Sequence, residues 1–256
     1  MRLRTLATTL AVLCGLATFL SNTVEATVVI FSVGDSSLAL TGNVDVSGVG
    51  SFAMSDQAPG SRETTYTGTI TVDVDDLFNP TVMSVLSANV IANVNGNWSP
   101  NDGGTAPSPL SPGNYGISVP LIGGTGKARG VVFDLAAAST AVAAGGAFNV
   151  SGESFTFTAG NLDVFSTALN DGNSVALTGS AANVSALAGQ YTSSPTELLL
   201  RVPAQFTIPF TIAGTPTVSG TMTLTGVLNG VASVPEPSTF GLTAMWGLLL
   251  VRRRRS

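Results

Sequence analysis

The stretch Gln205-Phe206-Thr207-Ile208-Pro209-Phe210-Thr211-Ile212 decides the fold that this sequence predicts. Its apolar residues occupy every second position, and Gln, Thr or Pro stands between them. Because successive side chains of a β-strand point to opposite faces, this alternation is typical of a strand with one buried and one wet face. Pro209 has no backbone N–H, so we expect this strand to be an edge strand or to carry a bulge.

The same two-residue period recurs along residues 27–233, where segments rich in Gly, Pro, Asn and Ser separate the runs. The sequence therefore predicts one all-β domain over residues 27–233, an antiparallel β-sandwich of the jelly-roll type. Residues 81–94 also fit helical spacing and stay open between strand and helix. The other alternating apolar positions are Leu38, Leu40, Val44, Val46, Ile70, Val72, Val74, Val131, Phe133, Leu135, Phe155, Phe157, Leu162, Val164, Val175, Leu177, Met222 and Leu224.

Composition excludes several kinds of chemistry. The predicted domain has no His and no Cys, since the single Cys14 precedes it, so it lacks the usual zinc and copper ligands and cannot form disulfides. It carries four basic residues against 13 carboxylates, a net charge of −9. A surface this poor in Lys and Arg cannot neutralise phosphates, which excludes nucleic acid as a partner.

One short block resembles a catalytic motif. Gly34-Asp35-Ser36-Ser37-Leu38 is similar to the nucleophile block of GDSL-type esterases, and this resemblance implies Ser36 as nucleophile. That chemistry needs a His base, and the chain has no His. We therefore interpret the block as a turn entering a strand, assign no catalytic residue, and expect the protein not to be an enzyme. A glycosidase or lyase that uses two carboxylates stays open as an alternative.

Calcium is the one cofactor that the composition leaves open. Asp73, Asp75 and Asp76 cluster at the end of a predicted strand, and Asn101-Asp102 and Asn170-Asp171 stand in Gly-rich turns. No EF-hand spacing accompanies them, so we expect a solvated acidic face and no metal or other cofactor.

Residues 95–114 form a predicted loop with four prolines. A loop of this length inside a compact domain indicates either a functional loop or a boundary between subdomains. Trp98 lies in it and is the best candidate for a ligand contact, because carbohydrates stack on exposed aromatic rings. The alternative is an indole packed against the sheet. A carbohydrate-binding module is therefore a rival prediction for the function.

The last residues, 234–256, combine three features. Pro235-Glu236-Pro237 interrupts regular structure, an uncharged run follows from Phe240 to Val251, and Arg252 to Arg255 close the chain. A helix of that run is about 18 Å long, whereas the hydrocarbon core of a bilayer is about 30 Å thick. We expect a short C-terminal transmembrane helix whose arginines snorkel and stay in the cytoplasm, with the preceding residues outside.

These three features, in this order, resemble the PEP-CTERM sorting signal of Gram-negative bacteria. The resemblance implies that exosortase, a membrane protease, recognises and processes Pro235, Glu236 and Pro237. It also implies that Arg252, Arg253, Arg254 and Arg255 stop transfer at the inner membrane. It covers only residues 234–256 and carries no information on the activity of the domain before them.

The N-terminal residues indicate export. Arg2 and Arg4 precede an apolar run from Leu6 to Leu20, and Val24-Glu25-Ala26 fits a cleavage site, so residues 1–26 are predicted to be a signal peptide cut after Ala26. We expect transient anchoring in the inner membrane and then a cell-surface or extracellular location. The expected role is structural or adhesive, in the envelope or in the exopolysaccharide of a biofilm matrix.

Overall fold

The computed structural model describes residues 26–149, 153–179, 181–184, 187–212 and 217–234. Ala26 is exposed and directly precedes the first strand. The rest of the predicted signal peptide, the PEP motif, the predicted transmembrane helix and the arginine cluster lie outside these ranges. Within them, no helix has both the length and the apolar character that a membrane span requires.

The described chain folds almost entirely into strands, which confirms the predicted all-β class. The elements are β1 (Thr27–Val46), β2 (Gly50–Ala53), β3 (Ser55–Asp56), β4 (Glu63–Val74), β5 (Val82–Ala92), β6 (Gly96–Trp98), β7 (Ser111–Gly113), β8 (Tyr115–Val119), the 3-10 turn η2 (Pro120–Ile122), β9 (Gly124–Ala141), β10 (Ala147–Asn149), β11 (Glu153–Ser166), β12 (Asp171–Ala176), β13 (Ala181–Val184), β14 (Ala188–Ser193), β15 (Glu197–Ile212) and β16 (Val218–Ser233).

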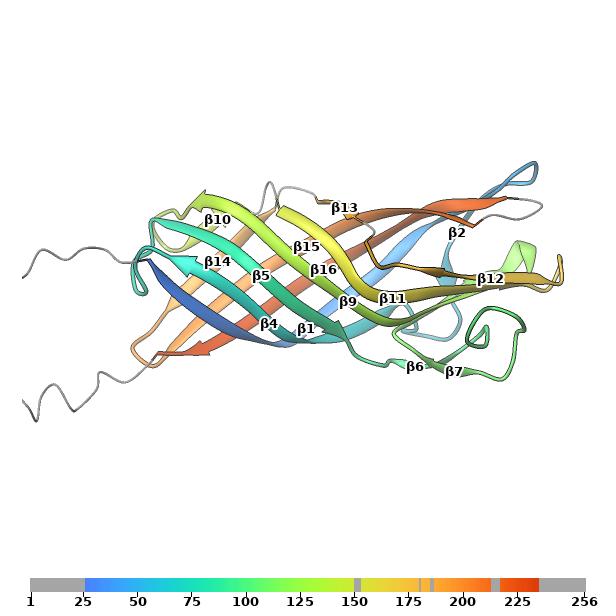
Figure 1. The fold of residues 1–256 in the computed structure, drawn as a ribbon, viewed down its shortest axis with the longest axis horizontal. Helices are drawn as coiled ribbons and strands as arrows, with labels where there is room; N and C mark the ends of the chain where they lie inside the picture. The colour runs from blue at the N-terminus through green and yellow to red at the C-terminus, as the bar shows by residue number, and fades with distance from the viewer. Residues whose placement is uncertain (1–25, 150–152, 180, 185–186, 213–216, 235–256) are drawn as a thin grey trace, which may run out of the picture.

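The long strands form one antiparallel sheet that closes on itself (Figure 1). From β16 the hydrogen-bonded order runs through β1, β4, β5, β9, β11, β13 and β15, and β15 pairs again with β16. The predicted antiparallel pairing is confirmed. The predicted jelly-roll connectivity is wrong, because a jelly roll contains Greek keys, in which a long connection crosses to a more distant strand. The strands of the ring follow one another in chain order, and the described strands that lie between them in the sequence are short.

The strand that contains Pro209, β15, has neighbours on both sides. Along one side it pairs with β16 over its whole length, and Pro209 lies opposite Thr221. On its other side, β14 pairs with residues 198–201 and β13 with residues 206–207. β15 is therefore not an edge strand as a whole, as one of the two predicted alternatives had it. At Pro209 itself no described strand pairs with that side, so a residue without an N–H is tolerated in this gap of the ladder.

The ambiguous segment 81–94 contains β5, a strand between β4 and β9. Its buried residues change phase: Met83 and Val85 face the core, then Ala88 and Val90 do. The pairing with β4 shifts register at this point, and Leu86 is exposed at the bulge. One extra residue breaks the two-residue period, which explains why the segment also fits helical spacing.

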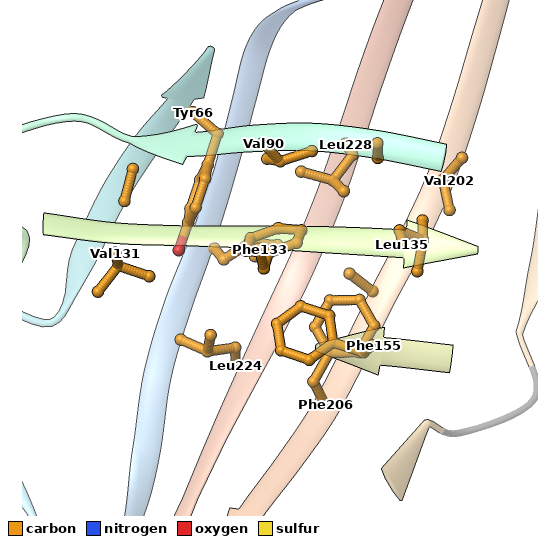
Figure 2. Close-up of a cluster of buried hydrophobic side chains, with 14 of the residues drawn as sticks. Tyr66, Val90, Val131, Phe133, Leu135, Phe155, Val202, Phe206, Leu224 and Leu228 are labelled. Atoms are coloured by element: carbon orange, nitrogen blue, oxygen red, sulfur yellow. The ribbon is translucent and has the colours of Figure 1, made fainter. Parts of the chain in front are cut away.

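The core lies inside the closed sheet and centres on an aromatic cluster (Figure 2). Phe133 of β9 has its ring 4.5 Å from Phe155, 5.5 Å from Tyr66 and 6.0 Å from Phe206. Phe155 of β11 and Phe206 of β15 stack at 4.0 Å. Each of these side chains is at most 1% exposed, so the alternating apolar residues of widely separated strands meet here.

The two ends of the described domain lie together. Ser32 of β1 pairs with Val231 of β16, and in Figure 1 the start of β1 and the end of β16 are at one end of the elongated molecule. We call this the proximal end. The distal end, on the other side, carries the turn at residues 47–49, η2 and the turn at residues 167–170.

Candidate functional site

The predicted loop at residues 95–114 is an arm with its own two-stranded sheet, in which β6 pairs with β7. Asn114 fastens its base, since its side chain donates to the carbonyl of Ala92 and accepts from the N–H of Val131, both at 2.9 Å. Gln57 fastens its outer part by donating to the carbonyl of Ser99 and accepting from its N–H. The arm is therefore bound closely to the main sheet.

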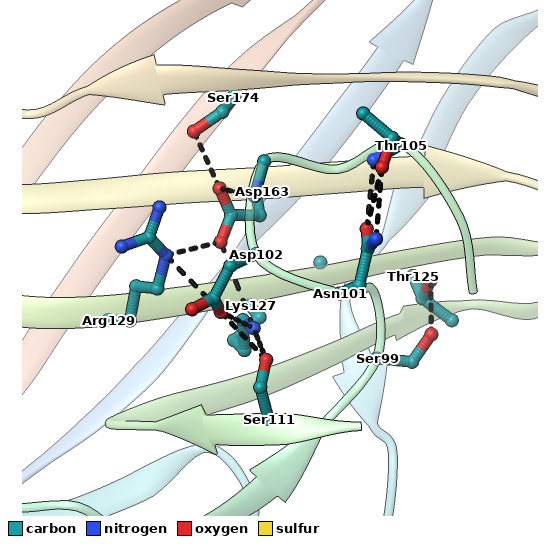
Figure 3. Close-up of polar contacts among 12 residues, drawn as sticks. Ser99, Asn101, Asp102, Thr105, Ser111, Thr125, Lys127, Arg129, Asp163 and Ser174 are labelled. Carbon is teal, nitrogen blue, oxygen red and sulfur yellow. Dashed lines mark hydrogen bonds and ion pairs between the residues drawn. The ribbon is translucent and has the colours of Figure 1, made fainter. Parts of the chain in front are cut away.

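Beneath the arm lies a cluster of charged side chains, which we call the ionic cluster (Figure 3). Its members come from β9, β11 and the arm. Lys127 Nζ is 2.6 Å from Asp102 Oδ1 and 3.8 Å from Asp163 Oδ2, and Arg129 Nε is 2.7 Å from Asp163 Oδ2. The side chains of Lys127 and Asp163 are 0% exposed. Two carboxylates thus bind two of the four cations of the domain. One of these cations, Lys127, is completely buried.

Hydrogen bonds complete this cluster. Asp163 Oδ1 accepts from Ser174 Oγ at 2.5 Å and from the N–H of Gly103 at 3.2 Å. The hydrogen bond from Lys127, followed by that from Ser111, holds the pKa of Asp102 below its ordinary value. The hydrogen bond to Asp163 raises the pKa of Arg129. The charges balance within the cluster, which joins the arm to β9 and β11.

One contact in the cluster resembles a nucleophile with its base, because Ser111 Oγ lies within hydrogen-bond distance of Lys127 Nζ. The surrounding bonds argue against that chemistry. Lys127 donates to Asp102, and Ser111 Oγ donates to the same carboxylate at 2.7 Å. A base must be free to take a proton from the nucleophile, whereas this amine is buried as an ion-pair donor. The cluster acts as a clamp for the arm.

Sequence reasoning missed this cluster. The available signal was weak: Lys127 and Arg129 are two of only four cations and stand two residues apart on one strand, so they share a face. Nothing in the spacing of Asp102 and Asp163 indicates that both meet them.

Trp98 takes the packed alternative that the sequence left open. The side chain is half-buried, and its ring packs against Gly96 and Gly113 of the arm and Gly116 of β8. A Cβ on Gly116 would lie 2.6 Å from Trp98 Cδ2, and one on Gly113 would lie 3.0 Å from Trp98 Cδ1. The indole Nε1 is buried, and no described residue accepts its hydrogen bond. The part of the ring that faces these glycines is therefore covered by the arm and by β8.

Replacing Gly116 by Ala should displace the indole of Trp98. The new methyl overlaps the ring, and we expect a destabilisation of about 1–3 kcal/mol because overpacking forces side chains to move. In a protein of residues 27–234, Trp98 is the only tryptophan, so its fluorescence emission should shift to the red. Gly34→Ala is the control, since a Cβ there meets no atom within 4 Å. Unchanged emission in Gly116→Ala would contradict the packed position.

Ser36 lies inside a strand. It is 1% exposed at a bulge of β1, where the register with β4 and with β16 shifts after Val33. Its Oγ donates to the carbonyl of Gly34 at 3.0 Å and accepts from the N–H of Asn229 at 2.7 Å. The expected turn entering a strand is therefore wrong in detail: the block is a β-bulge within one long strand, and Ser36 stabilises it.

Two of the carboxylates considered for calcium, Asp75 and Asp76, cap a turn. Asp75 accepts from the N–H groups of Thr81 and Val82, and Asp76 accepts from those of Phe78 and Asn79. Asp102 belongs to the ionic cluster, and Asn101 bonds to the backbone of the arm. Within the described ranges, no group of three or more His, Cys, Asp or Glu side chains is arranged to hold a metal ion.

Acid should destabilise the fold. Hydrogen bonds from Arg62, Thr81 and Lys127, respectively, lower the pKa values of Asp56, Asp75 and Asp102 below their ordinary value of 3.8. A carboxylate whose pKa is lower in the folded state adds stability above its unfolded pKa, and this stability is lost as the pH falls through the folded pKa. The melting temperature should therefore be level above about pH 5 and fall below about pH 4.

Circular dichroism melting curves of residues 27–234 between pH 7 and pH 2 measure this effect. Asp102→Asn should make the fall shallower. Asp45→Asn, at an exposed position outside every ion pair of the described residues, should leave the curve unchanged. A melting temperature that rises on acidification would contradict the predicted loss of stability in acid.

No protein-family model, curated protein or solved structure matches this chain. The class of protein is therefore defined by the described residues alone. They form an antiparallel all-β domain whose sheet closes on itself, and ion pairs attach the arm at residues 95–114 to this sheet.

Proposed function

We propose that this chain is an exported surface or extracellular-matrix protein with a non-catalytic, structural or adhesive role in the envelope or in an exopolysaccharide matrix. The proposal rests on the export and sorting signals in the sequence, and the sequence between them contains no complete catalytic motif. Exosortase and the inner membrane are its proposed partners during sorting, and exopolysaccharide is a proposed partner afterwards.

The structural observation that supports the proposal is the shared location of the two domain ends. Ser32 pairs with Val231, so the predicted signal peptide and the predicted sorting tail both join the proximal end. A domain anchored by its tail would then extend its distal end away from the membrane. Continuous pairing along 16 residues between β15 and β16 supports a stiff, elongated spacer.

We also infer that the closed sheet is flattened into a β-sandwich with two facing layers. Side chains from strands that do not pair support this. Tyr115 of β8 donates to the carbonyl of Leu38 on β1 at 3.2 Å, and the ring of Phe31 on β1 meets that of Tyr191 on β14 at 6.2 Å, edge to face. Such contacts across the interior are expected between the inner faces of two packed layers.

Processing of the tail tests the sorting proposal. Replacing Pro235-Glu236-Pro237 by three alanines should remove the recognition site and leave the stop-transfer arginines intact. The variant should accumulate, unprocessed, in the inner membrane of a host that has exosortase. Ser238→Ala with Thr239→Ala is the matched control beside the motif and should be processed normally. Deleting residues 252–255 should instead weaken retention, since these charges resist translocation.

Cell fractionation with C-terminal mass spectrometry measures each result. Wild-type protein at the cell surface should lack its terminal arginines. Surface protein that keeps Arg252 to Arg255, or normal processing of the alanine variant, would overturn the sorting proposal.

A further inference from the structure

A cavity of about 180 Å³ opens at the distal end of the domain. Its walls come from seven strands and from η2, and most of the lining residues are apolar. Residues that line it include Val44, Ile117, Leu162, Val164, Phe210 and Ile212. Leu169 and Asp171 also line it, and both are exposed, so the cavity reaches the surface at the turn between β11 and β12.

This cavity is too large to be a simple packing gap. Protein interiors are close-packed, and voids larger than a water molecule are few. An apolar cavity of about 150 Å³ lined by Leu, Ile and Phe stays dry and binds benzene. The walls here have the same character, and the volume admits one aromatic ring or a short alkyl group.

The charges around the mouth select against anions. Asp171 lies at the mouth, and none of the described lining residues is Lys or Arg. The nearby cations Lys127 and Arg129 are committed to Asp102 and Asp163 in the ionic cluster. A bound carboxylate or phosphate would therefore meet a negative charge without a compensating positive one.

Polar atoms at the same rim suit an uncharged hydroxyl or amide. Asn173 is exposed there and can donate or accept. Thr125 and Ser166 also line the cavity, and Ser166 Oγ already donates to the carbonyl of Ile122 at 2.9 Å. A ligand with an apolar body inside and a neutral polar group at Asn173 satisfies both regions.

We infer that the distal cavity is a binding site for a small uncharged amphiphile, with its aromatic or short alkyl part between β8, β11 and β15 and its hydroxyl or amide at the mouth. This inference is independent of the sorting proposal, since it depends only on the cavity and its rim.

The test uses the full chain in detergent-free lipid discs and two fluorinated probes that differ in charge, 4-fluorobenzyl alcohol and 4-fluorobenzoate. Fluorine NMR should detect saturable, one-to-one binding of the alcohol. Binding of the benzoate should be weaker by about tenfold or more. Val164→Phe fills the cavity and should weaken binding of the alcohol by about tenfold or more. Val175→Phe, a half-buried valine on β12 outside the lining, is the matched control and should bind like the wild type.

A second variant keeps the test valid if Val164→Phe fails to fold. Leu162→Ala, on the same face of β11 as Val164, enlarges the cavity and should admit a fluorinated naphthyl alcohol that the wild type excludes. Equal binding of alcohol and benzoate, or signals that do not saturate and are the same in Val164→Phe, would overturn the inference. Tail processing is unaffected by either outcome, so this failure is distinct from a failure of the sorting proposal.

Discussion

Replacing Asp163 by Asn is expected to lower the free energy of unfolding by about 3–5 kcal/mol, because breaking a buried ion pair leaves an uncompensated charge. Asp163 is 0% exposed and is the carboxylate that both Arg129 and Lys127 face. Without it, the fully buried Lys127 keeps only Asp102, whose side chain is 58% exposed. The amide that replaces the carboxylate also turns a donor toward one of these cations.

Chemical denaturation of residues 27–234 measures this change. Asp45→Asn is the matched control, since it removes one carboxylate from an exposed position and should change the stability by less than about 0.5 kcal/mol. If Asp163→Asn lowers the free energy of unfolding no more than Asp45→Asn does, the ionic cluster is not a clamp. The arm should also become sensitive to proteases in the variant, because Asp163 accepts the N–H of Gly103.

Replacing Phe133 by Ala should cost about 3–5 kcal/mol, the usual range for a buried Phe. Its side chain is 0% exposed and meets three other rings, so a smaller residue leaves a cavity at the centre of the core. For a domain of this size, each kcal/mol lowers the melting temperature by about 2–4 °C, which gives a fall of about 6–20 °C.

Thermal melting followed by circular dichroism tests this. Phe78→Ala removes an equal volume from a side chain that is 47% exposed, and its melting temperature should stay close to that of the wild type. Similar shifts for the two variants would contradict the position of the core. A broadened, non-cooperative transition in Phe133→Ala would show that the aromatic cluster also specifies a unique packing of the core.

The sequence predicted the strands well where alternation is uninterrupted. Phe206, Ile208, Phe210 and Ile212 all face the core, as the two-residue period requires. The period breaks wherever a bulge inserts one residue. Leu86 on β5 and the bulge at Ser36 on β1 are such places. The pattern left strand and helix open at the first and indicated a turn at the second. Local periodicity reports which face a residue occupies, and a bulge changes that face without changing the strand.

The topology could not be predicted in the same way. Periodicity shows that a segment is a strand, whereas the choice of neighbouring strand depends on contacts between distant residues. Closure of the sheet depends on β9 pairing with β11 and on the short β13 joining β11 to β15. Their side-chain pattern is compatible with a jelly roll as well as with the ring that forms.

The site shows the same limit. Trp98 was identified as the notable residue of the arm, but its packing depends on glycines of the arm and of β8. The pairing of Lys127 with Asp102 and Asp163 joins three separate segments, and no spacing rule links them. The sorting residues are the reverse case: Pro235 to Pro237 were recognised from sequence, and they lie outside the described ranges.

One labelling measurement tests the central claim, that the domain is exported with its distal end outward. Val49 lies in the distal turn and is 61% exposed, and Cys14 of the predicted signal peptide is the only cysteine of the chain. The variant Val49→Cys, made together with Cys14→Ser, is produced in an exosortase-containing host and treated, in intact cells, with a maleimide that cannot cross membranes. We predict that the protein is labelled before the cells are broken. Labelling only after lysis would contradict the surface location and the function proposed from it.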